Sequence, residues 1–333
     1  MEGIAFRGLL GRLPGMSITT IDCAYLGDGF AAAYLVREGD RAAFVETNTT
    51  HAVPRLLAAL EAEGLGPEAV DWVIITHVHL DHAGGASALM EACPNATLLA
   101  HPRAARHAID PTKLVASAKE VYGEAAFAEL YGEIAPIDEA RVRIMEDEET
   151  LTWGERTLTF LHTRGHANHH FCVLDSKTNA IFTGDAFGLV YPRLQHHGLF
   201  AIPSTSPTDF DAAAAKASLD RIVATGAERA YLTHFGGHEQ LDAIAAQLHR
   251  QLDLYDGIVR KALADGLEGE ALDAFCDERV RALFAQLLET HGLADDAEAR
   301  TILETDMSLN AQGVAFAVKK AQHKARVRAE ETR

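Results

Sequence analysis

THVHLDHAGG, at residues 76–85, brings three histidines and an aspartate into six consecutive positions. These donors are His77, His79, Asp81 and His82, and they directly follow the apolar run at 72–75. Imidazole nitrogens and carboxylate oxygens at this density are the ligands that Zn²⁺, Fe²⁺ or Mn²⁺ require. The alternative is a chance cluster of polar residues at a strand-to-helix turn, but a solvated loop has no reason to collect such donors. The sequence therefore predicts a metal site here.

The directions of these side chains predict two metal positions rather than one. Residues 72–76 form a short apolar run that is typical of a buried strand. If the extended backbone continues, His77 and His79 point to the same side, because strand side chains alternate. Asp81 is then expected to open a helix, since Asp is favoured at a helix start, so Asp81 and His82 leave the turn in another direction. The apolar stripe of this expected helix is Ala83, Ala86, Leu89 and Met90.

Three further apolar runs end in the same manner at a histidine or an aspartate. TLTFLHT precedes His166, AIFTGD ends in Asp185, and AYLTH ends in His234. Strand ends give rigid support to a rim of functional side chains. Gly165 and Gly184 each stand beside one of these donors, where a tight backbone turn would exclude a larger residue.

Together these segments resemble the metallo-β-lactamase superfamily of hydrolases. HxHxDH followed by AGG matches at 77–85, HTRGH matches the family's TPGH-like turn, and FTGD and YLTH match its last two ligand segments. The resemblance covers roughly residues 17–240. It implies an α/β fold, an αββα sandwich with two sheets between helix layers. The alternation of strand groups and helices along the chain favours only a mixed α/β class by itself.

The resemblance also implies a dinuclear centre. One metal would be held by His77, His79 and His166, the other by Asp81, His82 and His234, and Asp185 would bridge the two. Two divalent metal ions are therefore the expected cofactors. Zn²⁺ is the first choice, with Fe²⁺ or Mn²⁺ as alternatives, because selection depends on metal availability as well as on the ligands.

The chain is expected to hold one large domain and two additions. Residues 1–16 would be an N-terminal extension, and residues 17–240 the catalytic domain with a partly helical insertion at about 102–135. Residues 241–333 would be a helical C-terminal segment, because apolar residues there recur at helical spacing. Ser308 is expected to cap its last helix. The sequence leaves open whether these helices cover the metal site, pack beside it or form a dimer contact.

Composition narrows the class of protein. Of 333 residues, 48% are hydrophobic and 23% charged, as in ordinary globular proteins. The net charge of −18 disfavours a nucleic-acid partner, since affinity for phosphates comes from clustered Lys and Arg.

No run approaches the roughly 18 apolar residues of a membrane span, and the N-terminus has no export signal. The scattered cysteines Cys23, Cys93, Cys172 and Cys276 are typical of reduced thiols. We expect a cytoplasmic protein with a small-molecule acyl substrate and no membrane or nucleic-acid partner; a homodimer is left open.

The expected chemistry is metal-assisted hydrolysis of an ester, thioester or lactone. A water bridging two divalent cations becomes acidic, its pKa falling from about 15.7 towards about 7. The same cations stabilise the oxyanion formed on attack. Asp185 would fix the metal separation and hold the water, and Asp81 would receive its proton. His170 lies four residues after His166, as a histidine does in the glyoxalase II branch, and is a candidate for supporting a ligand or contacting substrate; a core or solvent-facing histidine is the alternative.

Longer stretches resemble a poorly characterised subgroup with a helical C-terminus. They are HPRAARHAIDPTKLVASAKEVYG from His101, PSTSPTDF from Pro203 and LNAQG from Leu309. No GCGR-type segment follows Asp185, which disfavours glutathione thioesters and sulfur dioxygenation, whereas lactone hydrolysis stays open. Arg164 stands where the family usually has proline. The resemblance thus indicates a glyoxalase II-like or lactonase-like branch.

Two other functions use the same ligands. One is a mononuclear iron oxidoreductase similar to persulfide dioxygenases, which would hold a single Fe and consume oxygen. The other is a low-turnover regulatory or binding protein that keeps the metal ligands without rapid catalysis. All seven ligand positions are intact, which counts against the latter.

Overall fold

The computed structural model describes residues 10–11 and 17–331. The N-terminal extension predicted for residues 1–16 lies outside the described residues, except for Leu10 and Gly11. The chain divides into two compact units. Unit 1 comprises Met1–His162, His169–Gly184 and Gly226–Glu239; unit 2 comprises Thr163–Asn168, Asp185–Thr225 and Gln240–Arg333. The functional division predicted at residues 17–240 and 241–333 stays a prediction.

Unit 1 contains two mixed β-sheets. The first has seven strands in chain order, antiparallel from β1 to β4 and parallel from β4 to β7. These are β1 (Leu10–Gly11), β2 (Ile18–Asp22), β3 (Ala32–Glu38), β4 (Arg41–Val45), β5 (Val70–Ile74), β6 (Thr97–Ala100) and β7 (Val142–Ile144). The second has six strands in the order β13-β12-β11-β10-β9-β8, and only its pair β11–β12 is parallel. These are β8 (Thr150–Trp153), β9 (Arg156–His162), β10 (Phe171–Asp175), β11 (Ala180–Gly184), β12 (Arg229–Leu232) and β13 (Gly236–His238).

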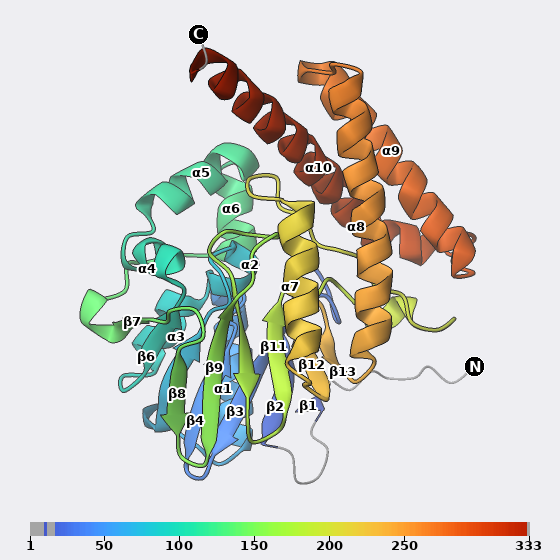
Figure 1. Cartoon of the computed structure of the whole chain (residues 1–333). Helices are drawn as coiled ribbons and strands as arrows, with labels where there is room; N and C mark the ends of the chain where they lie inside the picture. The colour runs from blue at the N-terminus through green and yellow to red at the C-terminus, as the bar shows by residue number, and fades with distance from the viewer. Residues whose placement is uncertain (1–9, 12–16, 332–333) are drawn as a thin grey trace. The chain divides into compact units, whose positions relative to one another are not determined.

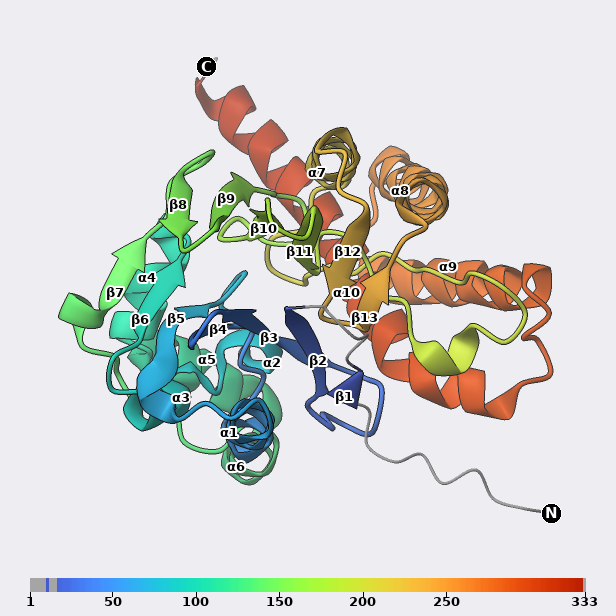
Figure 2. The same cartoon turned by 90° about the horizontal axis from the view of Figure 1, so that it is seen from below.

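The two sheets of unit 1 face each other across an aromatic core (Figures 1 and 2). The rings of Tyr34 and Tyr231 meet at 5.0 Å and those of Phe160 and Phe171 at 5.1 Å. Strand alternation sends Tyr34 into this core, whereas its neighbour Leu35 enters a second core on the opposite face of the seven-stranded sheet. Helices α1, α3 and α4 cover that opposite face.

The helices of unit 1 connect these strands. They are η1 (Thr50–Ala52), α1 (Val53–Ala62), η2 (Pro67–Ala69), α2 (Leu80–Ala83), α3 (Ala86–Ala92), α4 (Pro102–Ile109), α5 (Thr112–Tyr122), α6 (Glu124–Tyr131) and η3 (Glu139–Arg141). The partly helical insertion predicted at about 102–135 therefore consists of α4, α5 and α6.

The continuous helix expected from Asp81 is wrong, because α2 and α3 are separate and meet at Gly84 and Gly85. In a continuous helix Gly85 N would donate to Asp81 O, but here Asn48 bonds to both groups. Its backbone carbonyl accepts from Gly85 N at 2.7 Å, and its side-chain amide donates to Asp81 O at 2.8 Å. The approach is close, since a Cβ on Gly85 would lie 2.7 Å from Thr49 O. Asp81 and His82 thus stand on a one-turn helix that is fixed by the chain after β4.

Unit 2 is predominantly helical. It contains η4 (Pro192–Leu194), α7 (Ala212–Ala224), α8 (Leu241–Ala264), α9 (Gly269–Thr290) and α10 (Ala297–Glu331), and α10 packs against α8 and α9. The expected cap at Ser308 is wrong, because Ser308 lies inside α10. Asp296 caps this helix instead, since its Oδ1 accepts from Glu298 N at 2.9 Å and from Ala299 N at 3.0 Å.

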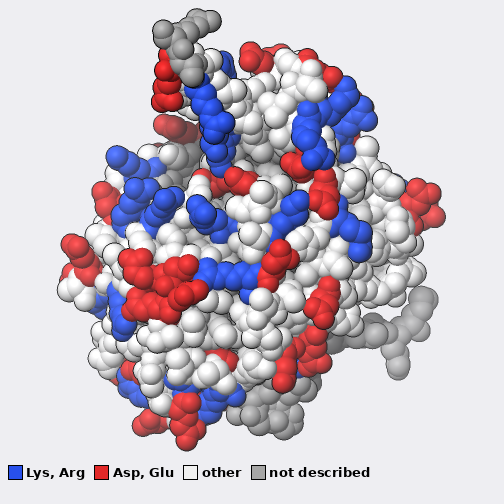
Figure 3. Space-filling model, in the orientation of Figure 1, with Lys and Arg blue, Asp and Glu red and all other residues white. Residues whose placement is uncertain are grey.

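The predicted α/β fold with two mixed sheets and C-terminal helices is confirmed. Within residues 10–11 and 17–331, no helix combines the length and apolar character needed to cross a bilayer. On the face drawn in Figure 3, acidic and basic side chains both occur and form small groups of each sign.

Candidate metal centre

The first donors stand on the loop that leaves β5. His77 is fully buried, and its Nε2 lies 2.9 Å from His79 Nδ1. The Thr76 hydroxyl donates its proton to the Glu46 carboxylate, so the same oxygen accepts from His77 Nδ1 at 3.1 Å. His77 therefore carries its proton on Nδ1 and presents the lone pair of Nε2 towards His79.

Asp81, His82 and His234 form a second group in unit 1. Asp81 and His82 lie on α2, and His234 follows β12. Asp81 Oδ2 is 3.6 Å from His82 Nε2 and 3.3 Å from His234 Nε2. The rings of His77 and His82 are 4.0 Å apart, so the two groups adjoin. Both histidines are buried, whereas the Asp81 side chain is 26% exposed, which gives solvent access at the carboxylate.

The far nitrogen of each imidazole in this group is held by an oxygen. His82 Nδ1 donates to Glu46 Oε1 at 3.2 Å, and His234 Nδ1 donates to the carbonyl of Phe30 at 2.7 Å. A carbonyl can only accept, so the proton of His234 is on Nδ1. Such bonds fix the tautomer and orient Nε2 as a ligand, which is the usual support of a metal-binding histidine.

Glu46 is a functional residue that the sequence analysis missed. It follows β4, is 1% exposed, and accepts from Thr76, from His82 and from the Thr233 hydroxyl at 3.3 Å. Its own carboxylate also lies among donor atoms of His77 and His82. One sequence signal could have found it: like the ligands, it is a polar residue directly after an apolar strand.

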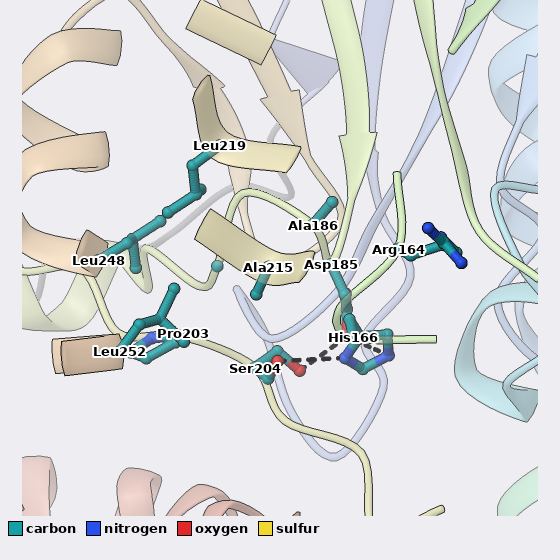
Figure 4. A pocket seen from close by; sticks show the side chains of 11 residues that line it. Arg164, His166, Asp185, Ala186, Pro203, Ser204, Ala215, Leu219, Leu248 and Leu252 are labelled. Carbon is teal, nitrogen blue, oxygen red and sulfur yellow. Dashed lines mark hydrogen bonds and ion pairs between the residues drawn. The ribbon is translucent and has the colours of Figure 1, made fainter. Parts of the chain in front are cut away.

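The remaining two predicted ligands meet in unit 2. His166 Nε2 lies 3.5 Å from Asp185 Oδ2, and both side chains are buried. His166 Nδ1 donates to the carbonyl of Ser204 at 3.2 Å, so its Nε2 carries the lone pair and faces the carboxylate. Both residues line a recess of unit 2, shown in Figure 4. Its other lining residues are Arg164, Ala186, Gly188, Pro203, Ser204, Ala215, Leu219, Leu248 and Leu252.

The turn that carries His166 is rigid without the family's proline. The Arg164 carbonyl accepts from the Ser218 hydroxyl at 2.6 Å, and the Gly165 carbonyl accepts from Asp211 N at 3.0 Å. Gly165 has φ +125°, and a Cβ there would lie 2.3 Å from the backbone of Ala215. Contact with α7 therefore fixes this turn and requires glycine, while the Arg164 side chain is exposed.

His170 and His169 lie beside the first donors of unit 1. His170 is fully buried, with its ring 4.9 Å from that of His77. A Cβ on Gly184 would lie 2.5 Å from His170 Nε2. His169 is half-buried, and its ring is 5.5 Å from that of His79. The role of His170 as a substrate residue stays a prediction.

These donors fit a divalent metal ion of the zinc type. Two ligand atoms that each lie about 2.1 Å from one tetrahedral ion are about 3.4 Å apart. The observed separations are 3.3 and 3.6 Å around Asp81 and 3.5 Å between His166 and Asp185, whereas His77 Nε2 and His79 Nδ1 are closer, at 2.9 Å. Neutral imidazoles with a carboxylate are also the donor chemistry that Zn²⁺, Fe²⁺ and Mn²⁺ share. Unit 1 gathers five of the predicted ligands (His77, His79, Asp81, His82 and His234), and unit 2 gathers His166 and Asp185; their assignment to individual metals stays a prediction.

Two relatives share part of the sequence. The metallo-beta-lactamase fold-containing protein ST1585 of Sulfurisphaera tokodaii is 28% identical over 142 residues, which cover 41% of this chain and 50% of that protein. The rubredoxin-oxygen oxidoreductase of Megalodesulfovibrio gigas is 30% identical over 132 residues, 40% of this chain and 27% of that protein. The chain thus spans half the length of the first relative and about a quarter of the second.

Solved structures share the fold. The crystal structure of ST1585 from Sulfolobus tokodaii has a TM-score of 0.62 at 20% identity, covering 90% of this chain and 99% of that one. The metallo-beta-lactamase family protein TTHA1429 of Thermus thermophilus has a TM-score of 0.59 at 18% identity, covering 88% and 89%. Residues 26–234 match the model of the metallo-beta-lactamase superfamily. That match spans well over half of the chain and contains every predicted ligand, so the protein belongs to the metallo-beta-lactamase superfamily.

Proposed function

We propose that this protein is a metal-dependent hydrolase with a dinuclear centre. His77, His79 and His166 would hold one divalent cation, Asp81, His82 and His234 the other, and Asp185 would bridge them. The proposal assigns donors of unit 1 and unit 2 to the same centre because the ligand segments occur along the chain in the order typical of the superfamily. Zn²⁺ is the expected metal, with Fe²⁺ or Mn²⁺ as alternatives.

One observation carries the proposal: Asp81, His82 and His234 place their donor atoms within 4.8 Å of one another. The histidines of this group are buried and oriented by Glu46 and by the Phe30 carbonyl. Building such a group costs stability unless a cation neutralises it, because buried polar atoms lose their hydration. The three donor atoms lie close together and the tautomers of both histidines are fixed. These two facts support a metal site better than a role in packing.

Divalent cations at this position supply an acidified water and an electrophile for the acyl carbonyl. The protein's own contribution is orientation and proton transfer. Asp81 is suited to accept the proton, because its carboxylate is the exposed member of the group and lies within 3.6 Å of two imidazoles. Asp185 is buried and takes a hydrogen bond from Ser204 at 2.9 Å, which suits a fixed ligand rather than a mobile base.

The substrate class that fits is a small acyl compound, an ester, thioester or lactone. The glyoxalase II-like or lactonase-like branch of the superfamily is the proposed placement, and His170 a proposed substrate-side residue. The net charge of −18 supports a small molecule over a polyanion. A cytoplasmic setting belongs to the same proposal, as the cysteines Cys23, Cys93, Cys172 and Cys276 are buried and unbridged.

Elemental analysis combined with a substrate panel tests this function. We expect about two Zn²⁺, Fe²⁺ or Mn²⁺ per chain, hydrolysis of some thioesters, lactones or aryl esters, loss of activity on full chelation, and recovery with Zn²⁺ or Mn²⁺. The His107→Ala variant is the control, since His107 lies on α4 outside the donor groups and should leave metal content unchanged. Full activity in completely chelated protein would contradict the proposal.

The second candidate is a mononuclear iron oxidoreductase similar to persulfide dioxygenases, because the same donors can hold iron; the partial similarity to a rubredoxin-oxygen oxidoreductase supports oxidoreductase chemistry in general and not persulfide as the substrate. Its signature in the same experiment would be one Fe per chain and oxygen uptake with a thiol persulfide. A protein that binds two metals but turns over no substrate in the panel would instead indicate a low-turnover regulatory or binding member.

A further inference from the structure

Ser204 contacts both metal-ligand candidates of unit 2 through different atoms. Its carbonyl accepts from His166 Nδ1 at 3.2 Å, and its hydroxyl donates to Asp185 Oδ2 at 2.9 Å (Figure 4). Asp185 Oδ2 is the same oxygen that faces His166 Nε2 at 3.5 Å. One residue therefore sets the rotation of an imidazole and of the carboxylate beside it.

The chain after Ser204 is held by the C-terminal helix α10. Thr205 is 3% exposed, and its hydroxyl lies 3.3 Å from the carbonyl oxygens of both Leu309 and Asn310. Those carbonyls belong to α10, so the hydroxyl can donate to either of them. The hydrogen bond from Thr205, the residue after Ser204, therefore connects the loop to α10.

Gly313 makes this approach close enough to need a missing side chain. A Cβ at Gly313 would lie 2.2 Å from Thr205 Oγ1 and 3.2 Å from Ser206 O. Glycine inside a helix costs about 1 kcal/mol relative to alanine. Glycine at this position therefore lowers the stability of the helix but allows α10 to contact the loop directly.

A second contact fastens the other end of the same segment. The Tyr191 hydroxyl donates to Asp306 Oδ1 at 3.3 Å, and both side chains are buried. Asp306, Asn310 and Gly313 are spaced four and three residues apart, so they share one face of α10. This face holds the segment from Tyr191 to Ser206 at both ends.

We infer that α10 is a structural part of the metal centre and that Ser204 is its positioning residue. The inference rests on the proposed function and deepens it. Through Thr205 and Gly313 the helix fixes the backbone of Ser204, and Ser204 then orients His166 and Asp185 towards a shared cation. Groups that hold metal ligands in place commonly change metal affinity 10–100-fold when they are removed. The PSTSPTDF and LNAQG segments are thereby explained as the two sides of one contact.

Metal retention in variants of the full-length protein tests the inference. Ser204→Ala removes the bond to Asp185, and Ser204→Thr keeps a hydroxyl at the same place. Gly313→Ala forces α10 away from Thr205. Gly257→Ala is its matched control, because Gly257 also lies inside a helix of unit 2 but a Cβ there meets nothing within 4 Å. The readouts are metal per chain after dialysis against graded chelator, the absorption spectrum of the Co²⁺-loaded protein, and the melting temperature of the metal-free protein.

We expect Ser204→Ala and Gly313→Ala to lose at least one metal at about 10–100-fold lower chelator concentration than the wild type. Ser204→Thr should recover most of the affinity, and Gly257→Ala should match the wild type. The metal-free Ser204→Ala protein should melt within a few degrees of the wild type, so that lower metal affinity can be told apart from a loss of folding. If Gly313→Ala fails to fold, the result for Ser204→Ala alone tests the inference.

Wild-type retention of both metals by Ser204→Ala and by folded Gly313→Ala would overturn the inference and leave the proposed function standing. A wild-type protein that binds no divalent metal would overturn the proposed function itself, and this inference with it.

Discussion

Glu46 Oε1 lies 3.2 Å from His82 Nδ1, and both side chains are essentially excluded from solvent. The same carboxylate accepts a hydrogen bond from the Thr76 hydroxyl, whose oxygen in turn accepts a hydrogen bond from His77 Nδ1. A single buried anion therefore fixes the tautomers of His77 and His82, which are proposed ligands of different metals. Its influence should therefore extend to both metals.

We predict that Glu46→Gln weakens the binding of both metals by about 10–100-fold, because the neutral amide orients His82 and Thr76 less strongly. Competition with a chromogenic chelator measures this. Glu61→Gln is the control, since Glu61 is an exposed carboxylate on α1. Loss of one metal with unchanged affinity for the other would contradict the shared role of Glu46.

His234→Ala should remove one metal and lower kcat by more than about 100-fold, because a site that stabilises developing charge loses its cation. Elemental analysis and steady-state kinetics on the best ester check both effects. His238→Ala supplies a matched control: His238 lies on the neighbouring β13 and bonds the Phe235 carbonyl rather than a donor group. Two metals retained in the His234 variant would argue against its role as a ligand.

Gly184→Ala should destabilise unit 1 by about 2–4 kcal/mol. A Cβ there would lie 2.5 Å from both His170 Nε2 and Thr76 Oγ1, and the backbone has φ +49°. Gly226→Ala separates the two causes, because Gly226 has a similar φ of +69° but no atom within 4 Å of its Cβ position. Urea unfolding of the metal-free proteins should show a cost of only about 1–2 kcal/mol for the control. Equal costs would mean that the contacts of Gly184 do not matter.

Stability should fall as pH is lowered from about 6.5 to 4.5. Burial and the neighbouring His162 lower the pKa of His101 to about 3, so the unfolded chain binds a proton in this range that the native protein does not. Burial likewise lowers the pKa of His107 and of His238. A histidine whose pKa is lowered in the native protein adds to the free energy of unfolding at high pH. This contribution is lost as the pH falls and the imidazole becomes charged in the unfolded chain.

The variant His101→Asn isolates one of these groups. Asparagine can still accept the helix-capping bond that His101 Nδ1 takes from Arg103 N at 3.0 Å. Between pH 7 and 5, urea unfolding of the metal-free variant should lose about 1 kcal/mol less stability than the wild type, allowing for solvent screening. Only below about pH 3, where His101 is protonated in both the native and the unfolded state, should the two proteins lose stability in parallel. The shared loss there comes from groups such as Glu38: although burial alone would raise its pKa, hydrogen bonds from Glu155, Lys177 and Arg156 lower it to about 2. An unchanged slope between pH 7 and 5 would rule out His101 as a contributor.

The donors of the first loop could be predicted from their density after a short apolar strand, whereas His166, Asp185 and His234 could be predicted from the resemblance to the family's ligand segments, each of which also ends such a strand. Glu46 also follows such a strand, yet its partners Thr76, His82 and Thr233 are 30, 36 and 187 positions away. Only the parallel pairing of β4 with β5 shows that Glu46 faces the ligand loop.

The errors have a common physical source. Asp81 is a plausible helix start by local preference, but Asn48 takes over the backbone bonds that would have continued the helix. Ser308 is a plausible cap, but α10 already begins at Ala297, after the cap Asp296, and its apolar residues pack against α9. Ser204 has no local signal at all, since its role depends on the path of a loop. Tertiary contacts decided each of these cases against local preference.

The bonds from Phe30 and Glu46 to the far nitrogens of His234 and His82 are made by the protein's own groups, so folding itself orders these imidazoles for an arriving cation. The entropy of arranging these side chains is then lost during folding and not at capture. Because this entropy is not lost on binding, the dissociation constant of the metal is lower, and a free ion at 100 times that constant stabilises the native state by about 2.7 kcal/mol. Resistance to heat should therefore report how well the pool of free metal is supplied.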